Sequence, residues 1–380
     1  LLPDSVLKEL QKLCDSVEPI PDAIAMQTIQ QELGQDTLDK YLLHPSKKME
    51  LVAAASLGQV YKATLRSGKQ VAIKVQRPDM VEKVSLDMFL LNQYGLFLDT
   101  VFAVLTQQIP FHVDFIDCFA RASFEELDYE KEAANQVFFK QEFKKRKCRV
   151  HIPQVYKELT SRRVICSEWI DGVKLADADQ ETIRRLIPVG VELFMTQLLD
   201  IGAFHADPHP GNLYVTTKGT LCLLDFGLCA EIDLKSRKAM TTAIVHLLNG
   251  DFDSLIARDA KDLGFLPQDM DVSELKPILT KILSEGLLES GSNLHARKRK
   301  LMSISNELNE VFFRYPFSVP PFFALITRGL GLLEGIALTG DADFDIFQAS
   351  YPYARKRAVK IYGGHRFGRF SRSMTQLKEP

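Results

Sequence analysis

The sequence predicts an α+β fold of two lobes, a small strand-containing lobe with helical insertions and a large helical lobe. Strand-type residues concentrate between 51 and 76, whereas helical spacing of apolar residues dominates most of the chain around them. A second pair of short strand-like runs lies between 205 and 227, inside the helical part. With 380 residues, the chain is long enough for two lobes.

The composition is that of a globular protein without a preference for nucleic acid. Hydrophobic residues make up 46% and charged residues 25% of the chain, and the formal net charge is −2, whereas nucleic-acid binders usually carry a basic excess. Basic stretches at 144–147, 297–300 and 355–372 are either solvated faces or contacts to an anionic membrane surface. Nothing in the sequence predicts an oligomeric state.

The cysteines and the first residue bear on the cellular setting. None of the six cysteines forms a CxxC pair, which argues against a zinc or thioredoxin-type site and fits a reducing compartment. The chain starts with Leu1 rather than Met, so we expect a fragment or a processed form from which any targeting segment is absent. No uninterrupted apolar run is long enough to span a membrane.

The part before residue 171 is predicted as helices around one β-hairpin. Residues 1–45 form a helical extension, and residues 46–170 form the small lobe with its helical insertion. The expected elements are a helix at 21–33 that stops at Gly34, strands at 60–65 and 71–75 around a turn at 66–69, helices over 79–147, and strands over 150–170.

Residues 171–380 are predicted as the helical lobe, entered through a linker at Gly172. The aromatic-rich stretch at 311–323 is either core of this lobe or a membrane contact. The expected elements are an amphipathic helix at 182–201, strands at 213–215 and 221–224 around a turn at 218–219, and helices interrupted near Gly250, Pro267, Gly291 and 316–321.

Lys74 ends the run Val71-Ala72-Ile73-Lys74 in the second strand of the hairpin. A lysine that emerges from a buried strand is costly unless it meets an anion. In protein kinases this arrangement places the lysine on the α- and β-phosphates of ATP. Taken alone the run is also compatible with a half-exposed lysine at a sheet edge.

Two further motifs follow Lys74 in the order that phosphoryl transfer requires. Asp207 and Asn212 lie five residues apart in a loop rich in proline and glycine, and the second short strand ends at Asp225-Phe226-Gly227. Phosphoryl transfer needs a carboxylate to orient the attacking oxygen and oxygen ligands for Mg²⁺. An Asx-rich turn explains the first loop alone, but not its combination with the hairpin, the second motif and Lys74.

An acidic helix expected over 124–135 offers a partner for Lys74. Glu125, Asp128 and Glu132 fall on nearly one face of such a helix, whereas Glu126 and Glu130 share another. The alternative is a solvated acidic face.

These residues together resemble the UbiB-like, or aarF-domain, atypical kinases over nearly the whole chain. The deciding motif is Ala53-Ala54-Ala55-Ser56-Leu57-Gly58-Gln59-Val60-Tyr61, which has alanines where protein kinases have a glycine-rich loop. Alanine restricts φ and adds a methyl group, so the loop should contact phosphates differently from glycine. An Ala-rich helix start is the alternative interpretation of this run.

The resemblance implies a two-lobed protein-kinase-like fold that binds ATP and Mg²⁺. It implies Asp207, Lys74 and Glu132 as catalytic residues, Asn212 and Asp225 as metal ligands, and Glu126 and Asp128 as a regulatory ExD motif. The nucleotide-binding residues that it implies are Ala53, Ala54, Ala55, Ser56, Gly58, Val60, Ala72, Lys74, Glu168 and Ile170, the last two at the adenine-contacting hinge.

Two departures bear on function. The family's KxGQ motif, which interacts with ExD, is not present in this sequence, so the role of Glu126 and Asp128 stays open. The chain also has no Ala-Pro-Glu after Gly227 and has Ala206 where protein kinases have the arginine before the catalytic aspartate. The missing Ala-Pro-Glu segment and the alanine at position 206 both argue against a conventional serine/threonine protein kinase.

The resemblance therefore implies a Mg²⁺-dependent ATPase or kinase that supports isoprenoid-quinone (prenyl-lipid) metabolism. A serine/threonine protein kinase and a non-catalytic nucleotide-binding scaffold are the alternatives. A prenyl-lipid or quinone and an anionic membrane surface are the implied partners besides the nucleotide. The resemblance is nearest to plastid members, which implies a chloroplast, at plastoglobules or thylakoids, with the mitochondrion as alternative.

Overall fold

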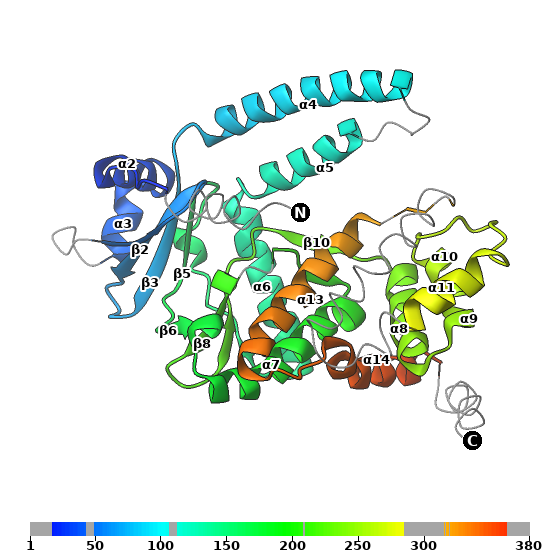
Figure 1. The fold of residues 1–380 in the computed structure, drawn as a ribbon. Coiled ribbons are helices and arrows are strands. Elements are labelled where there is room, and N and C mark those ends of the chain that lie inside the picture. Colours follow the sequence, from blue (N-terminus) through cyan, green and yellow to red (C-terminus); the bar gives the residue numbers. More distant parts are fainter. Residues whose placement is uncertain are drawn as a thin grey trace. The chain divides into compact units, whose positions relative to one another are not determined.

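The computed structural model describes residues 17–42, 49–105, 112–207, 210–284, 315, 317–318 and 320–362 (Figure 1). The chain forms two compact units, and we describe each by itself. The first unit comprises Leu1–Lys145, Ile152–Asp171 and Leu224–Leu228, and the second comprises Arg146–His151, Gly172–Leu223 and Cys229–Pro380.

A four-stranded antiparallel sheet forms the centre of the first unit, with the strand order β1-β2-β3-β5. The predicted hairpin is confirmed, because β2 and β3 pair from Gly58↔Gln76 to Thr64↔Gln70. Gly68 closes its turn with φ +82, a backbone conformation that glycine adopts at low cost. The strands are β1 (Glu50–Ala54), β2 (Gly58–Thr64), β3 (Gln70–Gln76) and β5 (Val164–Glu168).

Side-chain alternation along β3 gives the sheet two different faces. Val71, Ile73 and Val75 are buried on one face, where they pack with Ala25 and Ile29 from a helix. This helix is α2 (Asp22–Leu33), the predicted helix at 21–33, and it leads through Gly34 into α3 (Gln35–Tyr41). Both helices lie beside the sheet in Figure 1. Lys74 points to the other face.

Three further helices follow β3 in the predicted helical region. α4 (Met80–Leu105) and α5 (His112–Glu125) run side by side as a hairpin (Figure 1), and α6 (Tyr129–Arg146) packs through Tyr129 and Ala133 against the sheet. The expectation of one continuous acidic helix over 124–135 is wrong. The helix ends at Glu125 and a new one begins at Tyr129, because the Asp128 carboxylate accepts hydrogen bonds from the backbone N–H groups of Glu130 and Lys131.

The second unit contains the second predicted hairpin, between Leu213↔Leu223 and Val215↔Leu221. Two strands extend it, β4 in parallel beside β9 and β6 in antiparallel beside β8, and a separate pair joins β7 to β10. The strands are β4 (Val150–His151), β6 (Gly172–Lys174), β7 (Ala203–His205), β8 (Leu213–Thr216), β9 (Leu221–Leu223) and β10 (Cys229–Glu231).

Gly172, where the sequence predicts a linker between the lobes, begins strand β6 and is the first residue of the segment Gly172–Leu223 of the second unit. A Cβ atom at this position would lie 2.1 Å from the carbonyl oxygen of Val215 on β8. Glycine is therefore required here by the close approach of two backbones.

Helices make up most of the second unit (Figure 1). The predicted helix at 182–201 begins earlier, after the Asp179 cap, and its last six residues form a π-helical turn that ends at Gly202. The predicted break near Gly250 is confirmed, at the end of α8. The helices are α7 (Gln180–Met195), α8 (Leu234–Asn249), α9 (Phe252–Ser254), α10 (Ala260–Asp262), α11 (Leu275–Leu283), α13 (Pro321–Gly340) and α14 (Ile346–Tyr362).

Several expected features lie wholly or partly outside the described residues, including the basic stretch at 297–300 and most of 311–323. The basic stretch at 144–147 is exposed at the end of α6. Cys166 and Cys222 are buried. Within the described ranges, none of the helices combines the length and the apolar character needed to cross a bilayer.

Candidate functional site

Lys74 lies in the first unit between two carboxylates. Its Nζ atom is 2.8 Å from Glu132 Oε2 and 3.0 Å from Asp225 Oδ2. β3 presents the lysine, the first turn of α6 presents Glu132, and the segment that follows β9 returns to this unit and presents Asp225. The sequence interval between Lys74 and Asp225 is 151 residues. The fold therefore brings together three of the residues singled out in the sequence.

Charge and burial oppose one another in this cluster. Burial disfavours the ammonium group, but the negative charges of Asp225 and Glu132 outweigh that effect and raise the pKa of Lys74 well above its usual value. Burial, together with the charge of Asp225, raises the pKa of Glu132 from its usual 4.5 to about 7. Lys74 thus stays protonated, whereas Glu132 changes its protonation near neutral pH.

The protonation of Glu132 predicts a pH-dependent stability. The folded chain holds this proton up to about pH 7, whereas an unfolded glutamate releases it near 4.5. The folded state therefore binds more protons in this window, and the contribution of Glu132 to stability declines as pH rises from about 4.5 to about 7. The expected result is that Glu132→Gln loses this decline in melting temperatures measured between about pH 4.5 and about pH 8.

The exposed Glu130 on the same helix provides the matched control. Glu130→Gln should melt with the pH profile of the unmodified chain. If Glu132→Gln keeps the wild-type profile as well, the buried carboxyl group does not hold a proton in this range.

Tyr129 is a component of this site that the sequence did not reveal. Its ring is 1% exposed and its centroid lies 4.9 Å from Lys74 Nζ, within cation–π range. Burial raises the pKa of Tyr129. Among the described residues, no partner accepts or donates a hydrogen bond at its hydroxyl group. The signal in the sequence is an aromatic residue three positions before Glu132, one helical turn away.

Gly58 lies directly against this tyrosine at the start of β2. A Cβ atom on Gly58 would be 2.6 Å from Tyr129 Oη and 2.6 Å from the backbone oxygen of Val75. The second neighbour is backbone and cannot rotate away. The glycine is needed for space, since its φ is not positive.

Gly58→Ala is therefore expected to destabilise the first unit by about 1–3 kcal/mol. The overlap with Val75 forces β2 and β3 apart next to Lys74. Chemical denaturation followed by circular dichroism measures the change. Gly331→Ala is the control, because a Cβ atom added there would have no neighbour within 4 Å and an exposed helical glycine is usually improved by alanine. Equal stability of the two variants would contradict the packing argument.

The alanine motif at 53–61 contains the short loop between β1 and β2, and hydrogen bonds hold this loop in place. Ala53 and Ala54 end β1, so the run is not the start of a helix. The backbone N–H of Ala55 donates to the oxygen of Gly58 over 2.8 Å. Arg77 fixes the loop from outside, because its Nε atom donates to the oxygen of Ala55 and its backbone N–H donates to the oxygen of Leu57.

The remaining predicted nucleotide-contacting residues lie on the same sheet. Val60 is paired with Lys74, and Ala72 shares the face of Lys74 because it precedes the lysine by two positions. Glu168 ends β5, where its carboxylate accepts a hydrogen bond from the backbone N–H of Gln154 over 3.0 Å. Ile170 follows it and is half-buried. Contact of these residues with a nucleotide stays a prediction.

The two residues of the ExD motif have different surroundings. Asp128 caps α6, as described above, and this is a structural role that the sequence analysis did not assign. Glu126 lies close enough for its negative charge to raise the pKa values of Tyr129 and Glu132. The regulatory role of both residues stays a prediction.

Asp225 has a conformation suited to a metal-binding carboxylate. Its φ is +55, in the left-handed region that aspartate and asparagine tolerate better than most residues. Its Oδ1 atom accepts a hydrogen bond from the Gly227 N–H, and the side chain is 42% exposed. Phe226 anchors the segment, since it is fully buried and stacks on Phe139. An accessible carboxylate held at both oxygens fits the oxygen preference of Mg²⁺.

Asp207 and Asn212 belong to the second unit. The Asn212 side-chain amide donates to the backbone oxygen of Asp207 over 3.1 Å and so closes the loop between them. His205, the first residue of the motif, is 4% exposed, and its backbone N–H donates to the Gln197 side chain. The Asp207 carboxylate accepts a hydrogen bond from Arg328, a residue that the sequence analysis did not single out for the site.

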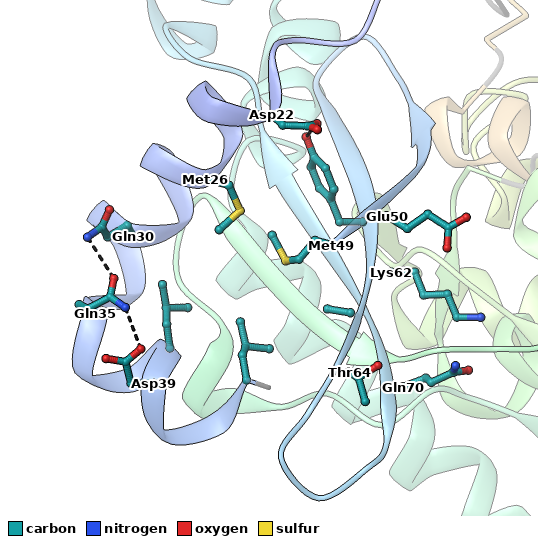
Figure 2. Close-up of a pocket in the computed structure, with 14 residues that line it drawn as sticks. Asp22, Met26, Gln30, Gln35, Asp39, Met49, Glu50, Lys62, Thr64 and Gln70 are labelled. Atoms are coloured by element: carbon teal, nitrogen blue, oxygen red, sulfur yellow. Dashed lines mark hydrogen bonds between the residues drawn. The ribbon is translucent and has the colours of Figure 1, made fainter. Parts of the chain in front are cut away.

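A cavity of about 600 Å³ lies elsewhere in the first unit, between α2, α3 and strands β1 and β2. Figure 2 shows Met26 and Met49 inside it, with Gln30, Gln35 and Asp39 joined by hydrogen bonds at one side. Three carboxylates and one lysine line it, and the Lys74 cluster does not. Its excess negative charge is unfavourable for a triphosphate.

Comparisons with known proteins agree with this picture. The family described as the ABC1 atypical kinase-like domain matches residues 12–258. The chain is 39% identical over 365 residues to Protein ACTIVITY OF BC1 COMPLEX KINASE 3, chloroplastic, of Arabidopsis thaliana, with 94% of this chain and 50% of the relative covered. An uncharacterized Synechocystis protein is 38% identical over 365 residues, with 94% and 52% covered. The chain thus spans about half the length of the curated relatives it matches.

One solved structure supports the fold. The complex of Rv3197 with erythromycin from Mycobacterium tuberculosis matches with a TM-score of 0.65 and 21% identity, covering 91% of this chain and 85% of that one. The expected α+β, kinase-like fold is confirmed.

Proposed function

Because the chain belongs to the ABC1 atypical kinase-like family, we propose that it binds ATP with Mg²⁺ and transfers or hydrolyses the γ-phosphate. The observation that carries the proposal is the contact of Lys74 with the buried Glu132 and with Asp225 in one unit. A lysine with a raised pKa is a permanent positive charge, and phosphate oxygens are the anions that such a charge binds in kinases.

In the first unit, Lys74, Glu132 and Asp225 are proposed to have different roles in the reaction. Glu132 holds Lys74 at the sheet, so that the ammonium group can meet the phosphates of the nucleotide. Asp225 supplies a carboxylate for Mg²⁺, which when bound neutralises charge on the phosphates and lowers the barrier to transfer. The alanine loop at 53–56 is proposed to cover the phosphates, and Ser56 can donate its hydroxyl to them.

Asp207 and Asn212 are proposed to act in the same reaction, on the basis of their motif. Asp207 orients the attacking oxygen and accepts its proton as the bond from that oxygen to the γ-phosphorus forms and the bond to the β-γ bridging oxygen breaks. The side-chain oxygen of Asn212 is proposed as a metal ligand. Its amide nitrogen is engaged with the backbone of Asp207, which leaves the oxygen as the acceptor end.

The cellular role is proposed from the family and its relatives. We infer that the activity supports isoprenoid-quinone metabolism in a plastid, at plastoglobules or thylakoids. The Arabidopsis relative is named chloroplastic, and the Synechocystis relative comes from a cyanobacterium. A prenyl-lipid or quinone and an anionic membrane surface are the proposed partners.

An ATPase assay of the purified chain tests this function, combined with thermal shift. We expect ATP to raise the melting temperature only when Mg²⁺ is present, and slow hydrolysis that quinone-like lipid or membranes stimulate. If ATP with Mg²⁺ leaves the melting temperature unchanged, the proposed function is contradicted. Binding without turnover would favour a nucleotide-binding scaffold, and peptide phosphorylation at roughly 1–100 s⁻¹ would favour a protein kinase.

A further inference from the structure

We propose that Arg328 is a positioning residue for Asp207, an inference that rests on the proposed phosphoryl transfer. Arg328 Nη2 donates to Asp207 Oδ1 over 3.0 Å, although 121 residues separate the two in sequence. Both residues lie in the second unit. An arginine that holds the aspartate of a phosphoryl-transfer loop from another helix controls where its carboxylate points.

The residue that precedes Asp207 cannot perform this task. Ala206 is fully buried and has no polar side chain. The loop itself is tied through the backbone oxygen of Asp207, which Asn212 holds. That bond fixes the main chain and leaves the side-chain torsions of Asp207 undetermined. The contact with Arg328 supplies a side-chain restraint, because it holds Oδ1 of Asp207.

The backbone of Arg328 is rigidly placed. It lies in α13, a helix of 20 residues that packs against α7. At Gly190 of α7 a Cβ atom would lie 3.3 Å from Leu333, so the two helices approach closely. Gly329 and Leu333 of α13 also share the wall of a small cavity of about 40 Å³ with Asn212. The loop and the helix are therefore neighbours beyond the single ion pair.

The ion pair of Arg328 and Asp207 contributes little to stability. A loss of activity on its removal would therefore reflect a functional role and not unfolding. The side chains of Arg328 and Asp207 are 58% and 39% exposed, and exposed ion pairs contribute little to the free energy of unfolding. A planar guanidinium offers five N–H donors in a fixed fork, so one of them can hold the carboxylate while others remain directed at solvent or at an anionic acceptor. A lysine at position 328 would keep the positive charge but would lack the planar arrangement of N–H donors.

A double-mutant cycle with ATP turnover as readout tests the inference. We expect Arg328→Ala to lower kcat by roughly 10- to 100-fold, the cost of a misplaced reactive group, with the nucleotide Kd unchanged. Arg328→Lys should recover part of the rate. In an Asp207→Asn background Arg328→Ala should cost less than about two-fold, because the group that it positions is already gone.

Arg185→Ala is the matched control, since this exposed arginine donates to a backbone oxygen in the same unit and lies outside the proposed machinery. Wild-type turnover in Arg328→Ala would overturn the inference. An equal loss in both backgrounds would also overturn it, because Arg328 would then act without Asp207. If Asp207→Asn itself turns over ATP at the wild-type rate, the proposed role of Asp207 fails instead. Melting temperatures of all variants, expected within about 2 °C of wild type, exclude a folding defect.

Discussion

Asp225→Asn is expected to weaken Mg²⁺-dependent ATP binding by about 100-fold or more, because the carboxylate charge held against Lys74 is lost. The substitution is conservative in every other respect. Asparagine keeps the shape, tolerates the φ of +55, and can still accept a hydrogen bond from Gly227. The loss should therefore reflect charge alone. Titration of the nucleotide with Mg²⁺, followed by thermal shift, measures it.

Asp171→Asn provides the control for this experiment. Asp171 lies in the same unit and its side chain is 62% exposed, 3.7 Å from Lys62. Its replacement should leave ATP affinity unchanged. The Asp225 variant should also stay folded, since removal of one carboxylate lowers the repulsion that Glu132 experiences. Wild-type affinity in a folded Asp225→Asn variant would exclude Asp225 as a metal ligand.

Asp259→Ala is expected to destabilise the second unit by about 3–5 kcal/mol, because the carboxylate at the centre of a buried hydrogen-bond network is lost. Asp259 is 1% exposed and contacts the ring nitrogen Nδ1 of His246, which is 2% exposed. It also accepts a hydrogen bond from Thr242 over 2.8 Å and one from Arg258. Alanine leaves all three without this acceptor. A fall of about 10 °C in the melting temperature is expected.

Asp262→Asn, three residues further along, is the control, because it removes a negative charge from a position that is much less buried than Asp259. Its side chain is 34% exposed and lies 3.4 Å from Lys235. A pair of this kind contributes about 0–1 kcal/mol, so the melting temperature should change by no more than about 3 °C. Equal effects of the two substitutions would mean that the buried network around Asp259 is not a determinant of stability.

The parts of the fold that could be predicted depend on local forces. The hairpin of β2 and β3 follows from alternation on either side of a glycine turn, and α2 follows from helical spacing that ends at Gly34. The sequence predicts an acidic partner for Lys74 between residues 124 and 135, and Glu132 contacts the lysine over 2.8 Å. The catalytic roles of both residues stay predictions.

The features that could not be predicted depend on distant segments. Arg328 meets Asp207 only because α13 packs beside α7, and no local pattern encodes this. The break of the acidic helix at Asp128 escapes prediction because the spacing of carboxylates fits a helix equally well with or without a cap. The close packing of Gly172 against Val215 also escapes prediction, since the space that a neighbouring strand requires leaves no local signal.

The hydrogen bonds that hold the alanine loop between β1 and β2 affect the conformational entropy that is lost on ligand binding. Glycine loops must lose conformational entropy when they settle on a ligand, and that loss reduces affinity. Here the cost is met during folding, because alanines have fewer accessible conformations and Arg77 fixes the loop through its contacts with Ala55 and Leu57. A preordered loop gives up the adaptability of glycine. With the proposed nucleotide bound beneath this loop, we expect its release to be slow relative to release from a flexible glycine-rich loop.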